Sequence, residues 1–460
     1  MFLFWIALLA GKLTKACSRL LSNVFHKSGT NLPGLVALKI CPEFIRYADK
    51  PETVVTITGT NGKTTTTNMV ADILDANGYH FYCNRLGSNI NSGIASSLID
   101  MVTLANKNRY KLAVLEADER SAPRIYPYLT PTYTICTNLF RDSLMRNAHP
   151  HFIFDLLDQY LPDSTTMILN ADDLLSGSLK KNNPRVFFSI DRQSADEDHI
   201  FNLVNDMPIC PNCQTKLVYD YVRYNQIGHA HCPKCGLTSP EGDWRVTTID
   251  RENQKLHILH EGREEVYPLA AKSIFNIYNE LSAITLLRTY GLSKEEVEKG
   301  LSTLKIVKTR YREDVAGSHR ILTTMAKSWI SPACSAVFRY VSRLPEDKEL
   351  VIMLEDDEIN VTSSEGLTYI YETDFEFLNQ PNIHRITFVG VRGKDFLYRM
   401  LMAGVPKEKV RVATSVEELP KQLLLEEGMD IHILFDMHQE KACEQIRETI
   451  IKTIRERESQ

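Results

Sequence analysis

A run of β-branched residues leads directly into a glycine-containing loop, and this arrangement restricts the possible fold most strongly. Residues 53–58 read Thr-Val-Val-Thr-Ile-Thr, which is typical of a buried strand, and residues 59–65 read Gly-Thr-Asn-Gly-Lys-Thr-Thr. From Asn68 to Leu74 the apolar residues recur at helical spacing. A strand, a glycine loop and a helix in this order predict a phosphate-binding loop, whereas the alternative is an ordinary tight turn.

Each residue type in the loop has a part in binding a nucleotide. Backbone N–H groups and a helix N-terminus present positive potential to phosphate oxygens, and glycine lets the phosphates approach closely. We predict that Lys63 reaches the β- and γ-phosphates and that the Thr64 hydroxyl binds Mg²⁺. Because Ile57 stands where the general pattern has glycine, the loop is a variant form. The predicted nucleotide contacts are Gly59, Thr60, Asn61, Gly62, Lys63, Thr64 and Thr65.

Polar residues follow two further strands of the predicted sheet. Glu116 comes at the end of the apolar run 112–115, and residues 137–142 read Thr-Asn-Leu-Phe-Arg-Asp after another predicted strand. The carboxyl ends of parallel strands face bound ligand. We therefore predict Glu116 as a second Mg²⁺ ligand, with Asp118 and Glu119 as competing candidates.

Two Cys-x-x-Cys pairs indicate a metal site. Cys210 and Cys213 are separated by 18 residues from Cys232 and Cys235, which lies within the spacing of a tetrahedral zinc ribbon. Four thiolates fill the coordination sphere, so we expect a structural Zn²⁺. Thiolate ligands, together with too few cysteines for a disulfide scaffold, favour a reducing cytoplasm.

Strands alternate with helical segments along most of the chain, which predicts a mainly parallel α/β sheet. Four regions are expected: an N-terminal helix and linker at 1–50, a central nucleotide-binding domain at 51–312, an inserted zinc ribbon at 205–243, and a C-terminal α/β domain of Rossmann-like type at 313–460.

The net charge of the chain and its N-terminal segment argue against nucleic-acid binding and against a cleaved signal. The formal net charge of −5 argues against a nucleic-acid partner. The apolar run that starts at Phe2 has no basic residues before it and is too short to span a bilayer, so a cleaved signal is disfavoured. We expect an amphipathic helix that packs on the protein or rests on a membrane surface.

These motifs together resemble a known family. The segment Thr58–Thr65 is similar to the ATP loop of Mur ligases. The patterns at 10–13 (Ala-Gly-Lys-Leu) and 32–38 (Leu-Pro-Gly-Leu-Val-Ala-Leu), the segment 137–142 and the four-cysteine ribbon resemble the MurT branch of that family in particular. The resemblance implies a Mur ligase-like central domain of P-loop ATPase type.

The resemblance also implies an activity and further site residues. ATP would phosphorylate the D-glutamate α-carboxyl of lipid II or a related peptidoglycan precursor, and ammonia from a GatD-like glutaminase in a heterodimer would then amidate it. Lys63 and Glu116 would be catalytic, Asn276 and Asn279 would lie near the nucleotide, and Arg312 falls where the family has a motif that starts the last domain. The protein would work in the cytoplasm, peripherally at the inner face of the membrane.

Several C-terminal segments depart from the family pattern. They are 326–331, 436–439 and 366–376, and in the last of these a family aspartate is replaced by Gly366. The resemblance implies that this last stretch lends a carboxylate to the glutaminase triad of the partner, with Glu372 and Asp374 as the candidates. Residues 367–375 alternate like a strand, so both carboxylates could point towards a partner. The changes leave two alternatives open: a Mur-type amino-acid ligase without glutaminase coupling, and a nucleotide-binding scaffold without catalysis.

Overall fold

The computed structural model divides the chain into two compact units. Unit 1 holds residues 1–140, 149–199 and 207–304, and unit 2 holds the described residues of 141–148, 200–206 and 305–460. The structure describes residues 1–25, 31–85, 88–142, 149–271, 273–304, 311–327, 330–354, 364–436 and 439–459. Residues 328–329 and 437–438, which belong to two of the departing segments, lie outside this description.

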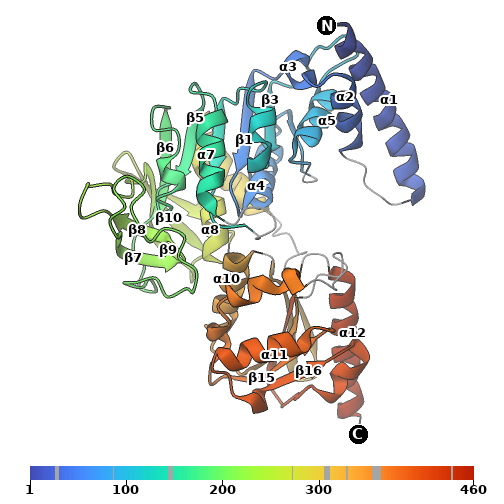
Figure 1. Cartoon of the computed structure of the whole chain (residues 1–460), viewed down its shortest axis with the longest axis vertical. Helices are drawn as coiled ribbons and strands as arrows, with labels where there is room; N and C mark the ends of the chain where they lie inside the picture. Colours follow the sequence, from blue (N-terminus) through green and yellow to red (C-terminus); the bar gives the residue numbers. More distant parts are fainter. Residues whose placement is uncertain are drawn as a thin grey trace. The chain divides into compact units, whose positions relative to one another are not determined.

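Unit 1 contains a mostly parallel sheet (Figure 1). Its strands are β1 (Thr53–Thr58), β2 (Phe81–Cys83), β3 (Leu112–Glu116), β4 (Tyr133–Cys136), β5 (Thr166–Asn170), β6 (Arg185–Ile190), β9 (Trp244–Asp250), β10 (Lys255–His260) and β11 (Arg263–Pro268). They lie in the order β11-β10-β9-β6-β5-β4-β1-β3-β2. Pairing is parallel from β2 to β9 and antiparallel from β9 to β11. The predicted parallel α/β sheet is therefore confirmed.

Helices cover both faces of this sheet. They are α1 (Phe2–Phe25), α2 (Leu32–Ile40), α3 (Phe44–Tyr47), α4 (Lys63–Ala76), α5 (Asn91–Met101), α6 (Ala122–Ile125), α7 (Pro150–Tyr160), α8 (Ile274–Tyr290) and α9 (Lys294–Thr303), with short 3₁₀ turns at η1 (Glu119–Ser121) and η2 (Ser176–Ser178). Successive residues of β3 alternate between two cores. Leu112 and Val114 pack with α4, α8 and α9, whereas Ala113 and Leu115 pack with α1, α2, α5 and α7. Because both faces are covered, residues 112–115 of β3 are all apolar rather than alternating between apolar and polar.

The ribbon segment, residues 191–243, connects β6 to β9. These two strands are direct neighbours in the sheet. Within the ribbon segment, β7 (Val218–Tyr224) and β8 (Ile227–His231) pair as an antiparallel hairpin. The hairpin strands begin after Cys213 and end before Cys232, so a metal bound by the cysteines would clamp the open end of the hairpin. The hairpin tip at residues 225–226 lies at the other end.

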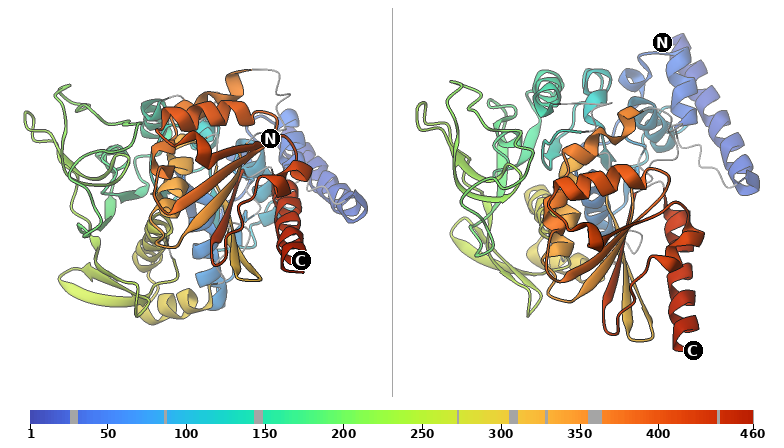
Figure 2. Two further views of the ribbon diagram at one scale, coloured as in Figure 1. Left: turned by 90° about the horizontal axis from the view of Figure 1, so that it is seen from below. Right: turned by 60° about the horizontal axis from the view of Figure 1, so that its bottom comes forward.

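Unit 2 contains a second α/β sheet with the order β12-β13-β17-β14-β15-β16. Pairing is parallel except between β12 and β13, and α12 lies along one side of the sheet (Figure 2). Its elements are β12 (Tyr311–Ala316), β13 (His319–Met325), α10 (Ser331–Ser342), β14 (Lys348–Met353), η3 (Ser364–Tyr371), η4 (Phe375–Leu378), β15 (Ile383–Val389), α11 (Gly393–Met402), η5 (Lys407–Lys409), β16 (Val410–Ala413), η6 (Val416–Lys421), β17 (Asp430–Phe435) and α12 (Glu440–Glu458).

The strand predicted at 367–375 is wrong, because this segment forms the 3₁₀ turns η3 and η4. Leu367 and Ile370 are buried three residues apart, and so are Phe375 and Leu378. In a 3₁₀ helix residues at i and i+3 share one face. The apolar residues therefore fit a 3₁₀ turn as well as a strand, and packing in unit 2 favours the turn.

Candidate active site

The glycine loop runs from the carboxyl end of β1 to the first turn of α4. Gly59 and Gly62 have φ values of +120° and +92°, which side-chain-bearing residues rarely adopt. A Cβ on Gly59 would lie 2.3 Å from Thr137 Oγ1, and one on Gly62 would lie 2.1 Å from Asn279 Oδ1. Both φ values therefore favour glycine, and a Cβ at either position would displace its neighbour. The helix that starts at Lys63 directs its N-terminus to the loop, which suits phosphate binding.

Lys63 lies within a set of acidic side chains. Its Nζ donates to Glu119 Oε1 and to Gly59 O, both at 2.6 Å, and Gly59 N donates to the same carboxylate oxygen at 3.0 Å. Burial acts to lower the pKa of Lys63, but the charges of Glu119, Asp118 and Glu116 outweigh it and hold that pKa above its ordinary value. The lysine therefore carries its positive charge at neutral pH.

Glu116 ends β3 opposite Ile57 of β1 and is buried. Its Oε1 accepts a hydrogen bond from Asn89 Nδ2 at 2.8 Å, and its backbone N–H donates to Asn84 Oδ1 at 2.8 Å. The two asparagines were not predicted from the sequence. The sequence signal for Asn84 is its position directly after β2, at the carboxyl end of a strand. Glu116 and Glu119 thus lie near the loop, and Glu119 contacts Lys63 directly.

The segment after β4 holds the glycine loop from one side. Thr137 Oγ1 donates to Asn61 O at 2.6 Å, and Asn61 N donates to Asn138 Oδ1 at 3.0 Å. Thr60 Oγ1 donates to Phe140 O and accepts from Phe140 N, both at 3.0 Å. The predicted position of this segment beside the loop is confirmed by these contacts.

Asn276 and Asn279 lie in the first two turns of α8. Asn279 is 6% exposed, and its Nδ2 donates to Asn276 Oδ1 at 3.2 Å. The close approach of Asn279 to Gly62 places this asparagine pair next to the glycine loop. Thr64 lies in the first turn of α4, also beside the loop.

The β7–β8 hairpin contacts residues 139–140, which follow β4. Gln226 Nε2 at the hairpin tip donates to Leu139 O at 2.9 Å, and Leu139 N donates to Asp173 Oδ2 at 2.7 Å. Tyr224 stacks on Phe140 with ring centroids 6.0 Å apart. Contacts therefore run from the hairpin through residues 139–140 to the glycine loop, and the sequence reasoning missed both Gln226 and Asp173.

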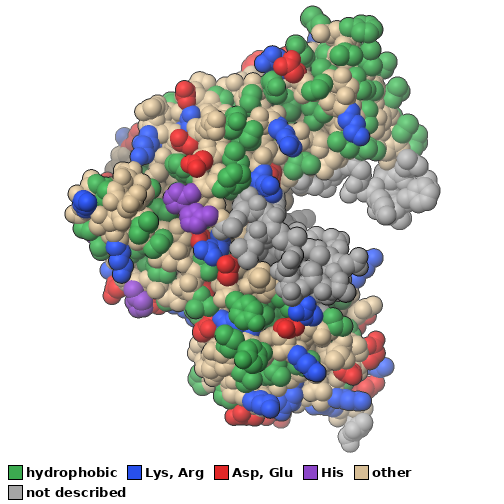
Figure 3. Space-filling model, viewed as in Figure 1, with side chains coloured by type: hydrophobic (Ala, Val, Ile, Leu, Met, Phe, Trp, Pro, Cys, Tyr) green, Lys and Arg blue, Asp and Glu red, His purple; other side chains and the backbone are tan. Residues whose placement is uncertain are grey.

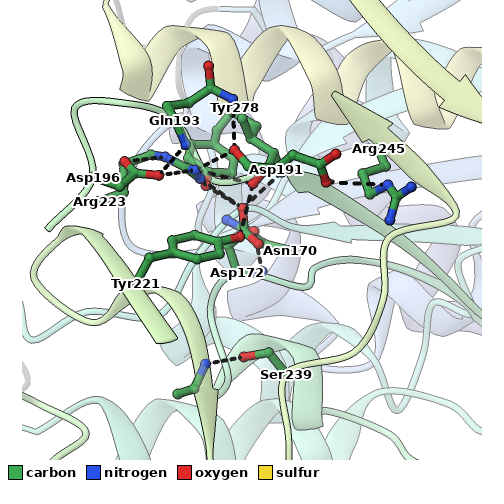
Figure 4. A network of polar contacts seen from close by, with 12 residues as sticks. Asn170, Asp172, Asp191, Gln193, Asp196, Tyr221, Arg223, Ser239, Arg245 and Tyr278 are labelled. Atoms are coloured by element: carbon green, nitrogen blue, oxygen red, sulfur yellow. Dashed lines mark hydrogen bonds and ion pairs between the residues drawn. The ribbon is translucent and has the colours of Figure 1, made fainter. Parts of the chain in front are cut away.

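A buried ionic network fixes the hairpin to the sheet (Figure 4). Arg223 Nη1 lies 3.0 Å from Asp172 Oδ2, and its Nη2 lies 2.7 Å from Asp196 Oδ2. All three side chains are 3% exposed. Tyr278, between the two asparagines of α8, donates to Asp172 Oδ2 at 2.5 Å. The network thus connects the hairpin, the end of β5 and α8.

The four predicted cysteines form one cluster. The Sγ atoms of Cys210, Cys213, Cys232 and Cys235 all lie within 4.8 Å of one another. Sulfur atoms at the corners of a tetrahedral Zn–S site lie about 3.8 Å apart, given a Zn–S distance of about 2.3 Å. The observed Cys210–Cys235 and Cys213–Cys232 separations of 3.5 and 3.4 Å are close to that value. The donor set therefore fits a metal such as zinc.

The acidic residues predicted for the C-terminal domain make contacts within unit 2. Asp374 is 2% exposed, and its carboxylate accepts from Leu203 N at 2.6 Å and from Asn202 Nδ2 at 2.8 Å. Burial raises the pKa of Asp374, and these hydrogen bonds oppose the rise. Glu372, whose side chain is 24% exposed, accepts from Arg141 Nη1 at 3.0 Å. Arg312 lies on β12, where its Nε pairs with Asp314 at 3.0 Å.

Comparison with known proteins supplies the family. A sequence model of the Mur ligase middle domain matches residues 57–287, and a model of the MurT ligase C-terminal domain matches residues 332–436. The chain is 31% identical over 406 residues to a Staphylococcus aureus (strain COL) protein named lipid II isoglutaminyl synthase (glutamine-hydrolyzing) subunit MurT, covering 87% of this chain and 88% of that protein. The chain belongs to the MurT family of Mur ligases.

Other relatives agree with this assignment. The Streptococcus pneumoniae (strain ATCC BAA-255 / R6) protein of the same name is 26% identical over 411 residues, which cover 88% of this chain and 89% of that protein. Among solved structures, a pseudomurein peptide ligase type C from Methanothermus fervidus superposes with a TM-score of 0.64 at 21% identity, covering 88% and 80% of the two chains. MurF from Acinetobacter baumannii gives 0.62 at 15% identity, covering 90% and 80%. These two structures show the shared Mur ligase-like fold.

Membership of the MurT family makes the protein an ATP-dependent ligase. The resemblance stated from the motifs is confirmed, and the match at 332–436 extends it through the region that holds Glu372 and Asp374. The chain therefore belongs to the MurT family although some of its C-terminal segments differ from the family pattern.

Proposed function

We propose that this MurT-family protein activates the D-glutamate α-carboxyl of lipid II with ATP and transfers ammonia to it. The relatives from S. aureus and S. pneumoniae bear the name of that activity and match nearly the whole chain. The observation that carries the proposal is the position of Lys63, which lies at a helix N-terminus among carboxylates and against the glycine loop.

The proposed reaction has two steps. A carboxylate oxygen attacks the γ-phosphorus of ATP, the bridging P–O bond to ADP breaks, and an acyl phosphate forms. Ammonia then attacks the acyl carbon, phosphate leaves and the nitrogen loses a proton, which gives an amide. Phosphorylation is needed because a carboxylate is a poor electrophile, and a positive charge at Lys63 would stabilise the charge that accumulates on the phosphates.

We assign Mg²⁺ to the same edge of the sheet. Thr64 and Glu116 are the proposed ligands, and Asp118 and Glu119 supply further oxygen donors near Lys63, which is the donor type that Mg²⁺ prefers. Asn276 and Asn279 would contact the nucleotide beside Gly62. Arg312 stays a proposed nucleotide contact on the basis of its family motif. Zn²⁺ at the four cysteines would be structural, because thiolates fill all four positions.

A GatD-like glutaminase is the proposed source of ammonia, bound as a heterodimer. The second unit would supply the carboxylate that orients the catalytic histidine of the partner, as the third member of a triad does. Glu372 and Asp374 are the candidates, and the greater exposure of Glu372 favours it. The complex would work in the cytoplasm, at the inner face of the membrane.

The nucleophile can be tested with the purified protein. ATP hydrolysis that requires both lipid II and ammonium is the expected result, with no stimulation when amino acids replace ammonium. Stimulation by an amino acid would indicate a Mur-type amino-acid ligase instead. Nucleotide binding without turnover under any of these conditions would indicate a scaffold.

A further inference from the structure

Helix α1 has one face that is packed on the protein. Phe4, Ala7 and Leu8 are buried in the core that also contains α2 and α5. A Cβ on Gly11 would lie 2.6 Å from Ile99 Cδ1 of α5, so the two helices approach closely there. This face accounts for the packing that the amphipathic pattern predicted.

The opposite face of α1 is apolar and exposed. Phe2 is 78% and Leu20 is 71% exposed, and the exposed set comprises Phe2, Leu3, Trp5, Ile6, Leu9, Leu13, Ala16, Cys17 and Leu20. At 100° per residue these positions fall on one side of the helix. None of the exposed side chains described on α1 is charged.

Helix α2 adds to this surface, which we call the apolar stripe. Leu32 and Leu35 of α2 are 47% and 45% exposed, and α2 packs along α1. Figure 3 shows hydrophobic side chains gathered over this end of unit 1. Scattered exposed apolar residues are normal on a soluble protein, but a continuous apolar stripe marks an interaction surface.

Two lysines bind α1 to α5, and the apolar stripe lies on the other side of α1. Lys12 Nζ donates to the carbonyl oxygens of Ile99 and Val102 at the end of α5, and Lys15 pairs with Asp100. A cation at a helix C-terminus interacts favourably with the helix dipole. These bonds hold α1 against α5 by its polar and small residues, so its apolar stripe faces away from unit 1.

Charge indicates the kind of surface that the stripe contacts. Residues 1–42 contain five Lys and Arg and no Asp or Glu, whereas the whole chain has a formal net charge of −5. Lys12 and Lys15 are bound to α5, and Lys39 of α2 is exposed. An exposed basic residue and a segment without acidic residues, beside an apolar helix face that carries a tryptophan, are typical of helices that lie in the interface of an anionic membrane. No helix in the described ranges is long and apolar enough to span a bilayer.

We propose that the apolar stripe of α1 and α2 docks on an anionic phospholipid bilayer. Trp5, Leu9 and Leu13 would enter the interface between headgroups and acyl chains, and Lys39, which is exposed on the same side of α2 as Leu32 and Leu35, would contact the anionic headgroups. Docking would bring the ligase to a substrate that is itself carried by a lipid, and this last point rests on the proposed function.

Vesicle sedimentation tests the docking directly. The full chain is mixed with vesicles of phosphatidylglycerol and phosphatidylcholine, or of phosphatidylcholine alone, and the bound fraction is measured. The variant Leu9→Glu/Leu13→Glu changes two side chains that are 52% and 58% exposed. The matched control Leu104→Glu/Phe152→Glu changes two side chains of unit 1 outside the stripe that are 64% and 53% exposed.

The wild type and the control are expected to bind anionic vesicles, with binding to neutral vesicles clearly weaker. The stripe variant is expected to lose at least about tenfold in partitioning, with an unchanged melting temperature. Equal binding by variant and control would overturn the proposal. A wild type that forms a dimer dissociated by the stripe mutations, and that leaves vesicles unbound, would assign the stripe to a second copy and also overturn it.

An activity assay separates this proposal from the proposed function. With lipid II in detergent micelles the stripe variant should match the wild type, whereas with lipid II in anionic vesicles it should be slower by about tenfold. Equal rates in vesicles would overturn docking as a means of reaching substrate. If neither protein amidates lipid II in micelles, the proposed function fails, while the sedimentation result still decides the docking.

Discussion

Replacing Arg223 by methionine is expected to destabilise unit 1 strongly. The guanidinium lies between Asp172 and Asp196 at 3.0 and 2.7 Å, and all three side chains are 3% exposed. Methionine retains much of the volume but removes the charge and its hydrogen bonds. Breaking a buried ion pair by removing one partner costs about 3–5 kcal/mol, because the remaining carboxylates stay buried without an opposite charge.

The pH dependence of this variant has a definite sign. Burial raises the pKa of Asp172 even with Arg223 present, and loss of the guanidinium should raise it further. A carboxyl whose folded pKa lies above its unfolded value stabilises the fold at low pH and loses this contribution as the pH rises through the folded pKa. The destabilisation caused by Arg223→Met should therefore be smaller at about pH 5 than at about pH 8.

Urea unfolding of wild type and variants at both pH values measures the free energy of unfolding. Arg245→Met is the matched control, because Arg245 pairs with Asp191 at 3.3 Å and is 37% exposed, and such pairs contribute at most about 1 kcal/mol. Adding Asp172→Asn to Arg223→Met should recover part of the loss, since the asparagine oxygen still accepts from Tyr278. A loss no larger than that of the control, or no recovery in the double variant, would refute this account of the network.

Three other changes have expected outcomes. Lys63→Ala should reduce ATP turnover by at least about 100-fold while the circular dichroism spectrum stays unchanged, and wild-type turnover would exclude its role at the phosphates. One equivalent of zinc should co-purify with the wild type, and Cys213→Ser should release it and lower the melting temperature, whereas full zinc retention would argue against the four-thiolate site. Glu372→Gln or Asp374→Asn should slow glutamine hydrolysis by the complex by about 100-fold or more and spare amidation with free ammonia. Normal glutamine hydrolysis in both variants would show that neither carboxylate completes the triad of the glutaminase.

The features predictable from the sequence are those whose determinants are local. The strand, glycine loop and helix at 53–76 follow from residues that are adjacent in the chain, and the cysteine cluster follows from two short knuckles of the same pattern. Parallel strands buried on both faces leave a strong apolar signal, so the central sheet was also predictable.

The rest depends on contacts between distant segments. Glu119 meets Lys63 across 56 residues, and Gln226 meets Leu139 across 87 residues. No short-range pattern specifies such pairs, so the sequence left Glu119 as one of three acidic candidates and gave no role to Gln226. At 367–375 the local pattern suited two structures, and only packing around Ile370 and Phe375 decided between them.

The most direct test of the whole account is glutamine-dependent amidation of lipid II by the purified chain in complex with its co-expressed glutaminase. With ATP, Mg²⁺ and glutamine, mass spectrometry of the stem peptide should find one new amide, located on the D-glutamate α-carboxyl, and one ADP should form for each amide. An unmodified stem peptide in the presence of an active glutaminase, or an added amino acid in place of the amide, would contradict the account.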